Sequence, residues 1–460
     1  MKITPLDTTT EKLVALARTL RYADLSAAAL RAAKARILST LAVSLAAYDM
    51  QPVRIARKLA QPVAAGPAAR IFGSLVATTP DMAAFVNSAM VRCLDMSDSY
   101  VMAAVSHPAD AFSAILAVAE AEHCSGRDLL LATALIYEVQ CRFVEVVPYN
   151  HHGWDQTPVV ALGAAIGCAR LLGLDDTQMR HAISLAVTPN LALNQTRTGT
   201  LSMWKGMAGP QGARGGVFAA YLAREGMTGP DDVFEGKFGL WKQMMNGEHF
   251  DLPLPLDFKN HTFAVQQTMI KSFPTRFNCQ VPVFTAQKLR TMLNINEIAT
   301  LKIESIRQAF ARWLDLPEIW HPATRETADH SLPCTVAMGM IDGTITPAMM
   351  EGNRFKDADV LALMAKCSIE LPDEFADLAP ETRCCRLTAT LKNGDTVVAE
   401  TRRSLADDVA DPGWFQAVDK FKALSAPLLD ERARACLVTW VDMLELHAGV
   451  GDLLELTKIA

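Results

Sequence analysis

Several features that mark particular classes of protein are missing from this sequence. Its ten cysteines include no Cys-x-x-Cys pair and no other spacing typical of zinc or iron–sulfur sites. The longest apolar run, near 129–139, is too short to cross a bilayer. The N-terminal segment Met1–Pro5 lacks the apolar core of a signal peptide. We therefore expect a soluble, cytoplasmic protein that does not associate with a membrane.

The sequence also has no excess of positive charge. Its formal net charge is −6 at pH 7 and no concentrated basic surface is visible, so binding of nucleic acid is not expected. A small anionic ligand would need only a few local Lys, Arg and His residues. The glycines between 199 and 216 match neither a Walker loop nor a dinucleotide fingerprint, because no strand precedes them and their spacing is wrong. We expect them to permit close packing of helices.

Apolar residues recur with helical spacing from residue 8 to about 240. Ala27–Ala47 and Val159–Leu172 carry small and aliphatic residues around their whole circumference, which predicts two buried helices. Helical character returns from Phe415 to about Leu446. The last helices are therefore expected to rejoin the first part of the chain.

The segment between these helical parts has a different pattern. Alternation over Thr300–Ile306 predicts a strand, and Asn393-Gly394 within Arg386–Glu400 predicts a β-hairpin. We predict a mainly α protein in which residues 1–265 and 405–460 form a large helical domain. Residues 266–404 are expected to form an inserted α+β lid domain.

The densest polar cluster in an apolar setting runs from Asp95 to Asp110. Asp95 and Asp98 are three residues apart, so if this segment is helical they share one face. His107 beside a carboxylate would suit general acid or base chemistry. The alternative is a simple helix start at His107, with Pro108 at the first helical position.

A second cluster, Gly153–Pro158, leads into the predicted buried helix. Asp155 and Gln156 would lie at the N-terminus of that helix, where unpaired backbone amides can hold an anion. Capping of the helix by Asp155 is an equal alternative. The adjacent His151 and His152 raise the idea of a metal, but no further ligand follows at i, i+4 spacing, and no metal site is expected.

Basic residues stand out in two further clusters. Lys205 lies between Trp204 and Gly206, and a lysine in apolar surroundings must find an anion or lose its proton. A surface lysine is the alternative. Lys271 and Arg276 could clamp carboxylates, with Arg276 offering the bidentate fork. A fifth cluster joins Asp329 to His330 at what resembles a helix start, so that a cap is its simplest interpretation.

In their order and spacing, these five clusters resemble the MmgE/PrpD family over nearly the whole chain. That family includes methylcitrate dehydratases, cis-aconitate decarboxylases and an iminodisuccinate epimerase. The segments that carry the resemblance are Leu94-Asp95-x-x-Asp98, His107-Pro108-x-Asp110, Ser202–Gly206, Thr228–Pro230, Phe234–Gly236, Lys271-x-Phe273-Pro274 and Ala328–Pro333.

The resemblance implies a discontinuous helical domain with an inserted α+β lid, a homodimer, and a pocket between the two domains. It also implies a cofactor-independent enzyme that uses neither a metal nor an organic cofactor. The catalytic residues that it implies are Asp95, His107, Lys205 and Lys271.

The branches of the family differ in the second cluster. Decarboxylase members look as though they carry His where this chain has Asp155. Methylcitrate dehydratases are more similar to this chain, with Asp followed by His where it has Gln156. The interval from Asp95 to His107 also resembles the dehydratase branch, whereas Trp204-Lys205-Gly206 is more similar to the broader family. The expected function is that of a lyase acting on a small polycarboxylate, most similar to a 2-methylcitrate dehydratase.

Dehydration of a 2-hydroxy tricarboxylate needs a base, an acid, and cations that stabilise the developing charge. We expect His107, oriented by Asp95, to transfer a proton, and Lys205 and Lys271 to stabilise charge. The residues expected to contact substrate are Asp98, Ser99, Asp155, Gln156, Arg276 and Gln280. A cis-aconitate decarboxylase-like enzyme, an iminodisuccinate epimerase-like enzyme and a non-catalytic carboxylate-binding protein remain alternatives.

Overall fold

The structure is a computed structural model that describes residues 7–310, 316–378, 380–410 and 413–459. The segment Met1–Pro5, in which we expect no signal peptide, lies outside the described residues. Helices dominate and strands are few, which confirms the prediction of a mainly α fold with a smaller α+β part. No helix in the described ranges combines the length and the apolar character needed to cross a membrane. The ten cysteines are all described and are all free thiols.

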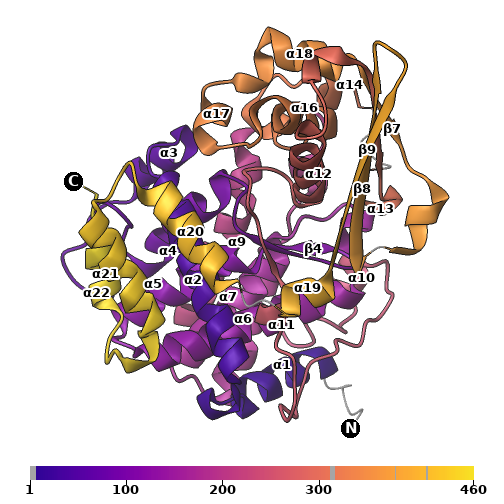
Figure 1. The fold of residues 1–460 in the computed structure, drawn as a ribbon. Coiled ribbons are helices and arrows are strands. Elements are labelled where there is room, and N and C mark those ends of the chain that lie inside the picture. Colours follow the sequence, from indigo (N-terminus) through magenta and orange to yellow (C-terminus); the bar gives the residue numbers. More distant parts are fainter. Residues whose placement is uncertain (1–6, 311–315, 379, 411–412, 460) are drawn as a thin grey trace.

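The first apolar core is built by helices from both ends of the chain. In Figure 1 the yellow helix α20, near the end of the chain, lies beside the indigo α2. The helices of this core are α1 (Thr8–Thr19), α2 (Ala27–Ala46), α3 (Gln51–Leu59), α4 (Pro80–Cys93), α5 (Phe112–Ala121), α6 (Gly126–Val146), α7 (Thr157–Leu171), α8 (Asp176–Val187), α9 (Ala208–Arg224), α10 (Leu240–Met244), α11 (Ala264–Gln267), α20 (Trp414–Ser425), α21 (Glu431–Asp442) and α22 (Gly451–Leu456).

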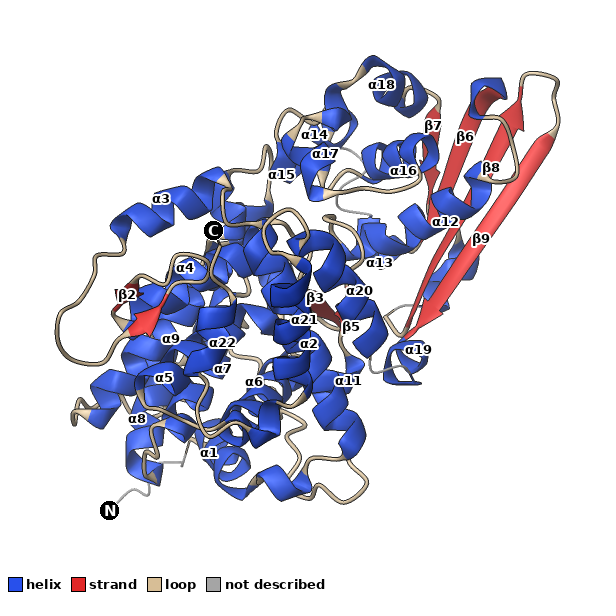
Figure 2. Ribbon diagram, turned by 60° about the vertical axis from the view of Figure 1, so that its left-hand side comes forward, coloured by secondary structure: helices blue, strands red, loops and turns tan. Residues whose placement is uncertain are grey.

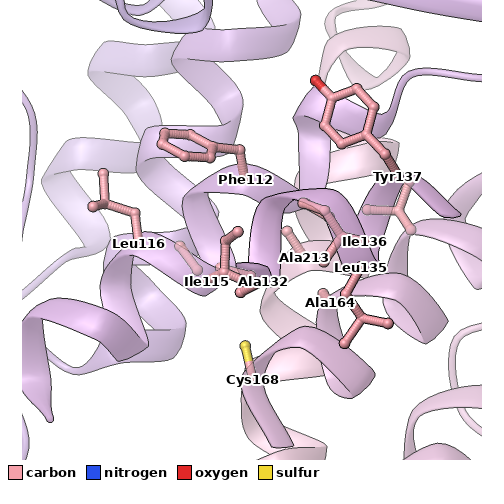
Figure 3. Packing of buried hydrophobic residues seen from close by; sticks show 14 of the residues in the cluster. Phe112, Ile115, Leu116, Ala132, Leu135, Ile136, Tyr137, Ala164, Cys168 and Ala213 are labelled. Carbon is pink, nitrogen blue, oxygen red and sulfur yellow. The ribbon is translucent and has the colours of Figure 1, made fainter. Parts of the chain in front are cut away.

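The two helices predicted to be buried are at the centre of this core. In α2, which is capped by the Ser26 side chain, every residue from 32 to 45 is buried. In α7 every residue from 157 to 169 is buried. Both predictions are confirmed. Figure 3 shows how small side chains such as Ala132, Ala164 and Ala213 lie among larger ones from neighbouring helices.

Glycines let these helices approach one another closely. A Cβ atom at Gly212 of α9 would lie 2.5 Å from the backbone oxygen of Thr157, and one at Gly216 would lie 2.7 Å from that of Ala161. Both oxygens belong to α7, so α7 and α9 are in contact through their backbones. The packing role expected for the glycines near 212 is therefore confirmed.

The second apolar core is formed by residues 273–399. Its helices are α12 (Gln280–Arg290), α13 (Arg307–Phe310), α14 (Pro317–Trp320), α15 (Arg325–Ala328), α16 (Leu332–Asp342), α17 (Pro347–Glu351) and α18 (Ala358–Met364). Its strands are β6 (Ile298–Ser305), β7 (Cys367–Glu370), β8 (Thr382–Leu391) and β9 (Thr396–Ser404). A short helix, α19 (Leu405–Ala410), follows β9.

These four strands form one sheet in the order β7-β6-β8-β9. β6 runs parallel to β7 and antiparallel to β8, and β8 and β9 form a hairpin whose paired residues include Arg386 and Glu400. The strand predicted over 300–306 and the hairpin around Asn393-Gly394 are therefore confirmed. Figure 2 shows the sheet at the edge of the molecule, with α12 and α16 on its inner side.

Buried residues of the first core extend to Ile270 and begin again at Trp414. Those of the second core begin at Phe273. The segment around Lys271 therefore joins the two cores. Our domain boundaries, at 265/266 and 404/405, stay a prediction. The described residues also form two small sheets. β1 (Ala69–Arg70) pairs with β2 (Ala77–Thr78), and β4 (Val105–Ser106), β3 (Asp98–Val101) and β5 (Met269–Ile270) form a three-stranded sheet in that order.

Candidate active site

A cavity of about 330 Å³ lies between the two cores. The first core contributes Arg92, Asp95, Val101, Val105, His107, Asn150, Asp155, Gln156, Asn194, Arg197 and Thr198 to its wall, and the rest of the wall is Lys271, Arg276, Phe277, Asn278, Leu316 and His330. Four of these side chains are cationic and two are carboxylates. A cavity of this size and charge suits a small polyanion.

The three-stranded sheet brings distant parts of the chain to this cavity. It consists of β3 (Asp98–Val101), β4 (Val105–Ser106) and β5 (Met269–Ile270), and β3 pairs with both of the others. His107 follows β4 directly and Lys271 follows β5 directly. Because β3 joins the two strands, it places residues 107 and 271 on one wall although they are far apart in sequence. Figure 2 shows β3 and β5 near the centre of the molecule.

Asp95 occupies a sharp turn between α4 and β3. Its φ angle is 49°, in the left-handed region that non-glycine residues seldom adopt and that Asp tolerates better than most. Asp98, in contrast, begins strand β3. The segment from Asp95 to Asp98 is therefore not helical, and the shared face that a helix would give these two residues does not form. The turn separates them, and only Asp95 lines the cavity.

Three cations surround the carboxylate of Asp95. Its oxygens lie 2.5 Å from Arg92 Nη1, 2.7 Å from Lys271 Nζ and 3.0 Å from Lys205 Nζ. Burial alone would raise the pKa of Asp95, but the positive charges of Arg92, Lys205 and Lys271 outweigh it and hold that pKa well below its usual range. These contacts favour the ionised form of Asp95, which holds the ammonium groups of Lys205 and Lys271.

Lys205 is held from the other side by a carboxylate of the second core. Its ammonium nitrogen lies 2.6 Å from both oxygens of Asp329. Asp329 also accepts a hydrogen bond from Nδ1 of His330. Burial opposes ionisation of Asp329, yet Lys205 and His330 keep its pKa below the usual value. A continuous chain of contacts therefore runs from His330 through Asp329, Lys205 and Asp95 to Lys271.

Asp95, Asp329 and His330 offer three donor atoms within 4.8 Å of one another, the spacing of a metal site. The ammonium group of Lys205 already contacts both carboxylates at 2.6–3.0 Å. A lysine therefore takes the position that a metal cation would need, and these residues do not fit a resident metal. His151 and His152, considered from the sequence, are exposed on the 3₁₀ turn Tyr149–His152, and neither belongs to the residues that line the cavity.

His107 is buried and held by β3. Its Nδ1 lies 2.8 Å from the backbone oxygen of Asp98 and 2.8 Å from Ser99 Oγ. A carbonyl oxygen only accepts, so Nδ1 carries the proton and Nε2 carries the lone pair. The expected orientation by Asp95 is therefore wrong, because β3 orients the ring. Burial, followed by the charges of Arg92 and Lys271, lowers the pKa of His107 well below its usual value.

Burial also lowers the pKa of Lys271, to about 8, although Asp95 opposes the shift. Lys271 is fully buried, and its ammonium group donates to both the side chain and the backbone oxygen of Asp95. A lysine with this pKa is still protonated at neutral pH but gives up its proton far more readily than an exposed one.

The N-terminus of α7 forms the part of the wall next to His107. Asp155 and Gln156 lie there, as expected from the sequence, but neither side chain caps the helix. Asp155 pairs with Arg197, whose Nε lies 2.8 Å from its Oδ2. Gln156 accepts from the backbone N–H of His107 and donates to Asp110 Oδ2 at 2.9 Å. Gln156 therefore ties α7 to the segment that carries His107.

The structure brings most of the expected site residues together, but at different depths. Asp95, His107, Asp155, Gln156, Lys271 and Arg276 line the cavity. Lys205 lies one layer behind Asp95, and Asp98 and Ser99 lie behind His107. Gln280 is fully buried and its amide bonds the backbone at Ser272 and Phe273, so it braces a turn instead of facing the cavity.

Among the titratable residues of the site, four were not in the set expected from the sequence, namely Arg92, Arg197, Asp329 and His330. Arg92 lies three residues before Asp95, a spacing that could have indicated an ion pair. Asp329 and His330 did stand out, but we interpreted them as a helix cap. The side chain that caps α16 is Ser331, which leaves Asp329 and His330 to the site. No pattern in the sequence indicated that Arg197 belongs to the site.

Two models of one protein family match the chain and together cover most of it. The MmgE/PrpD N-terminal domain matches residues 11–253, and the MmgE/PrpD C-terminal domain matches residues 273–446. Residues 11–253 include Asp95, His107 and Lys205, and residues 273–446 include Asp329 and His330.

Individual relatives have similar sequences along most of their length. The chain is 28% identical to a 2-methylcitrate dehydratase of Cupriavidus necator, over 95% of either protein. It is 29% identical to a 2-methylcitrate dehydratase of Escherichia coli over 84% of either protein, and 28% identical to a cis-aconitate decarboxylase of Mus musculus over 80% of this chain and 76% of the mouse protein. The extent of the first domain match alone shows that this chain belongs to the MmgE/PrpD family.

Proposed function

We propose that this protein is a lyase that dehydrates a 2-hydroxy tricarboxylate of the 2-methylcitrate type, without a metal or organic cofactor. The observation that carries the proposal is the meeting of His107, Lys271 and Asp95 at a cavity whose wall holds four cations. The names of the relatives support the lyase class. A homodimer in a reducing cytoplasm is part of the same proposal, and light scattering of the purified protein tests the dimer.

In the proposed reaction a base removes a proton from the carbon next to a carboxylate. His107 suits this role because it is neutral and has its lone pair on Nε2. The electron pair left on carbon spreads into the carboxylate, where the Lys271 ammonium group stabilises it. Asp95 keeps Lys271 in place through its contact of 2.7 Å.

The remaining cations would hold the other carboxylates of the substrate. Arg276 lines the cavity from the second core, and Arg197 lines it from the first, with Asp155 fixing its guanidinium. Lys205 contacts Asp95 and Asp329, so we propose that it acts by holding these two carboxylates and not by touching substrate.

Product analysis tests the reaction class. The purified protein is incubated separately with 2-methylcitrate, citrate, cis-aconitate and iminodisuccinate. Loss of water from 2-methylcitrate supports the proposal. Release of carbon dioxide from cis-aconitate, or inversion of iminodisuccinate, would instead favour the decarboxylase or the epimerase. Thermal stabilisation by these acids without any product would favour a binding protein.

A variant tests the role of His107. His107→Gln is expected to lower turnover by about a hundred- to ten-thousand-fold, the usual cost of losing an acid or base. His321→Gln is the matched control, because His321 is exposed and lies outside the cavity wall. Near-normal turnover of His107→Gln would remove His107 from the mechanism.

A further inference from the structure

Two imidazoles line the cavity, and they come from different cores. His107 follows β4 in the first core, and His330 lies between α15 and α16 in the second. Dehydration requires two proton transfers, one from carbon and one to the departing oxygen. The two rings differ in a way that separates these tasks.

The difference lies in what each ring contacts through Nδ1. Nδ1 of His330 donates to the carboxylate of Asp329, whereas Nδ1 of His107 donates to the neutral backbone oxygen of Asp98. A carboxylate at this position stabilises the imidazolium form, as it does in catalytic triads. Asp95 lies 3.8 Å from the same nitrogen of His330 and adds to the effect.

The charges around His107 act in the opposite direction. Arg92 and Lys271 both disfavour its imidazolium form. His107 therefore stays neutral and suits a base, whereas His330 has two carboxylates near its Nδ1, those of Asp329 and Asp95, which favour its imidazolium form. Two titratable groups with different surroundings are typical of an acid and base pair.

We infer that His330, held by Asp329, is the general acid that protonates the leaving hydroxyl group. This inference rests on the proposed dehydration. Asp329 is then a positioning residue, because it holds Nδ1 and does not face the reacting atoms. Its second contact, with Lys205, fixes the carboxylate itself.

The complete step balances without any further reactant. The C–H bond breaks, its proton forms an N–H bond at Nε2 of His107, and its electron pair becomes the second bond between the two carbons. The C–O bond breaks with its electron pair on oxygen, which takes the proton from Nε2 of His330 and leaves as water. His330 ends neutral and His107 ends as an imidazolium. His107 then loses one proton to solvent and His330 gains one from solvent, which restores the starting state.

Binding of the substrate would raise the pKa of His330 and so favour its protonated form. In the empty cavity, burial and then the charge of Lys205 lower the pKa of His330 to about 3, against the opposing effect of Asp329 and Asp95. A substrate carboxylate about 4 Å from the ring would raise this pKa by about three at an effective dielectric of about 20. Binding of a polycarboxylate therefore brings His330 towards neutral pH.

A substrate analogue isolates the acid step. In this analogue fluoride replaces the leaving hydroxyl group, and fluoride departs as an anion without needing a proton. His330→Gln is expected to lose about a hundred- to ten-thousand-fold in turnover of the hydroxyl substrate, while eliminating fluoride at close to the wild-type rate. His107→Gln is expected to lose both reactions, because each begins at the C–H bond. His321→Gln should change neither.

A second variant tests the role of Asp329. Asp329→Asn keeps an oxygen acceptor for Nδ1 but removes the charge that supports the imidazolium. The pH at which turnover of the hydroxyl substrate falls on the alkaline side should move to lower pH, with little effect on fluoride elimination. Circular dichroism establishes that both variants are folded.

The outcomes separate this inference from the proposed function. If the wild-type protein dehydrates the hydroxyl substrate and His330→Gln does so equally well, His330 is not the acid. Equal losses on the hydroxyl and fluoride substrates also overturn the inference. A wild-type protein that is inactive on both overturns the proposed function, and the inference with it.

Discussion

Replacing Lys205 with Met tests the network that joins the two cores. The Lys205 ammonium group lies 2.6 Å from both oxygens of Asp329 and 3.0 Å from Asp95, and all three side chains are buried. Without Lys205, Asp95 keeps Arg92 and Lys271, whereas Asp329 keeps the neutral ring of His330 and the guanidinium of Arg325 at 3.9 Å. The loss therefore falls mainly on Asp329.

Removing one partner of a buried ion pair costs about 3–5 kcal/mol, because the other charge stays buried. We expect Lys205→Met to lower the free energy of unfolding in urea by this amount. In an Asp329→Asn background the same change should cost only about 1 kcal/mol, the value of an ordinary hydrogen bond. Lys12→Met, at an exposed pair with Asp251, is the control and should cost under about 1 kcal/mol.

The pH dependence has a definite sign. The pKa of Asp329 is lowered in the folded protein, so its ionisation stabilises the fold above the unfolded value of 3.8, and this stability is lost as the pH falls further. Lys205→Met removes the main cause of the lowering, so acid unfolding should begin at a higher pH. An equal cost of Lys205→Met with and without Asp329→Asn would refute this account of the network.

Three further changes have defined outcomes. Burial and the charge of Lys271 lower the pKa of Lys420 to about 7 in the folded protein. Between about pH 7 and 10.5 the unfolded chain therefore binds this proton more tightly than the folded protein does. The free energy of unfolding should rise with pH over that window. Urea titrations at pH 7 and 9 should show a smaller increase in the free energy of unfolding for Lys420→Met than for the wild-type protein. An equal increase would argue against this role of Lys420. Arg197 contacts Asp155 through Nε and Nη2, and a lysine at this position would keep only one of the two contacts. Arg197→Lys should therefore raise KM for the substrate about tenfold and change kcat less. An unchanged KM would exclude Arg197 from substrate binding. A Cβ at Gly209 would lie 2.1 Å from Asp110 Oδ2, so Gly209→Ala should lower stability by about 1–3 kcal/mol in thermal unfolding, whereas Gly449→Ala, which meets open space, should not.

The sequence predicts those parts of the fold that local patterns decide. The buried helices α2 and α7 and the hairpin of β8 and β9 follow from periodicity and from one Asn-Gly turn. The return of helical spacing near the end of the chain predicts that the last helices rejoin the first part of the chain, and the structure shows which helix α20 contacts there, namely α2. These features depend on residues that are close in sequence or on a single apolar face.

The fine geometry of the site could not be predicted in this way. Asp95 leaves the helical region at a turn that contains no glycine to signal it. The partner of His107 is set by the pairing of β3 with β4, a register that the sequence does not state. Gln280 is polar but points into a turn, because polarity indicates a need for hydrogen bonds and not their direction.

The contact between Lys420 of α20 and the cavity wall affects how the protein is made. The Lys420 ammonium group donates to the backbone oxygens of Met96 and Lys271, so a late helix braces the loops that carry Asp95 and Lys271. Lys420 and Met96 are 324 positions apart, and closing so large a loop is entropically expensive until the intervening cores have formed. On a ribosome, the pocket would therefore be assembled only after nearly the whole polypeptide has emerged. Until then the loops that carry Asp95 and Lys271 lack this brace.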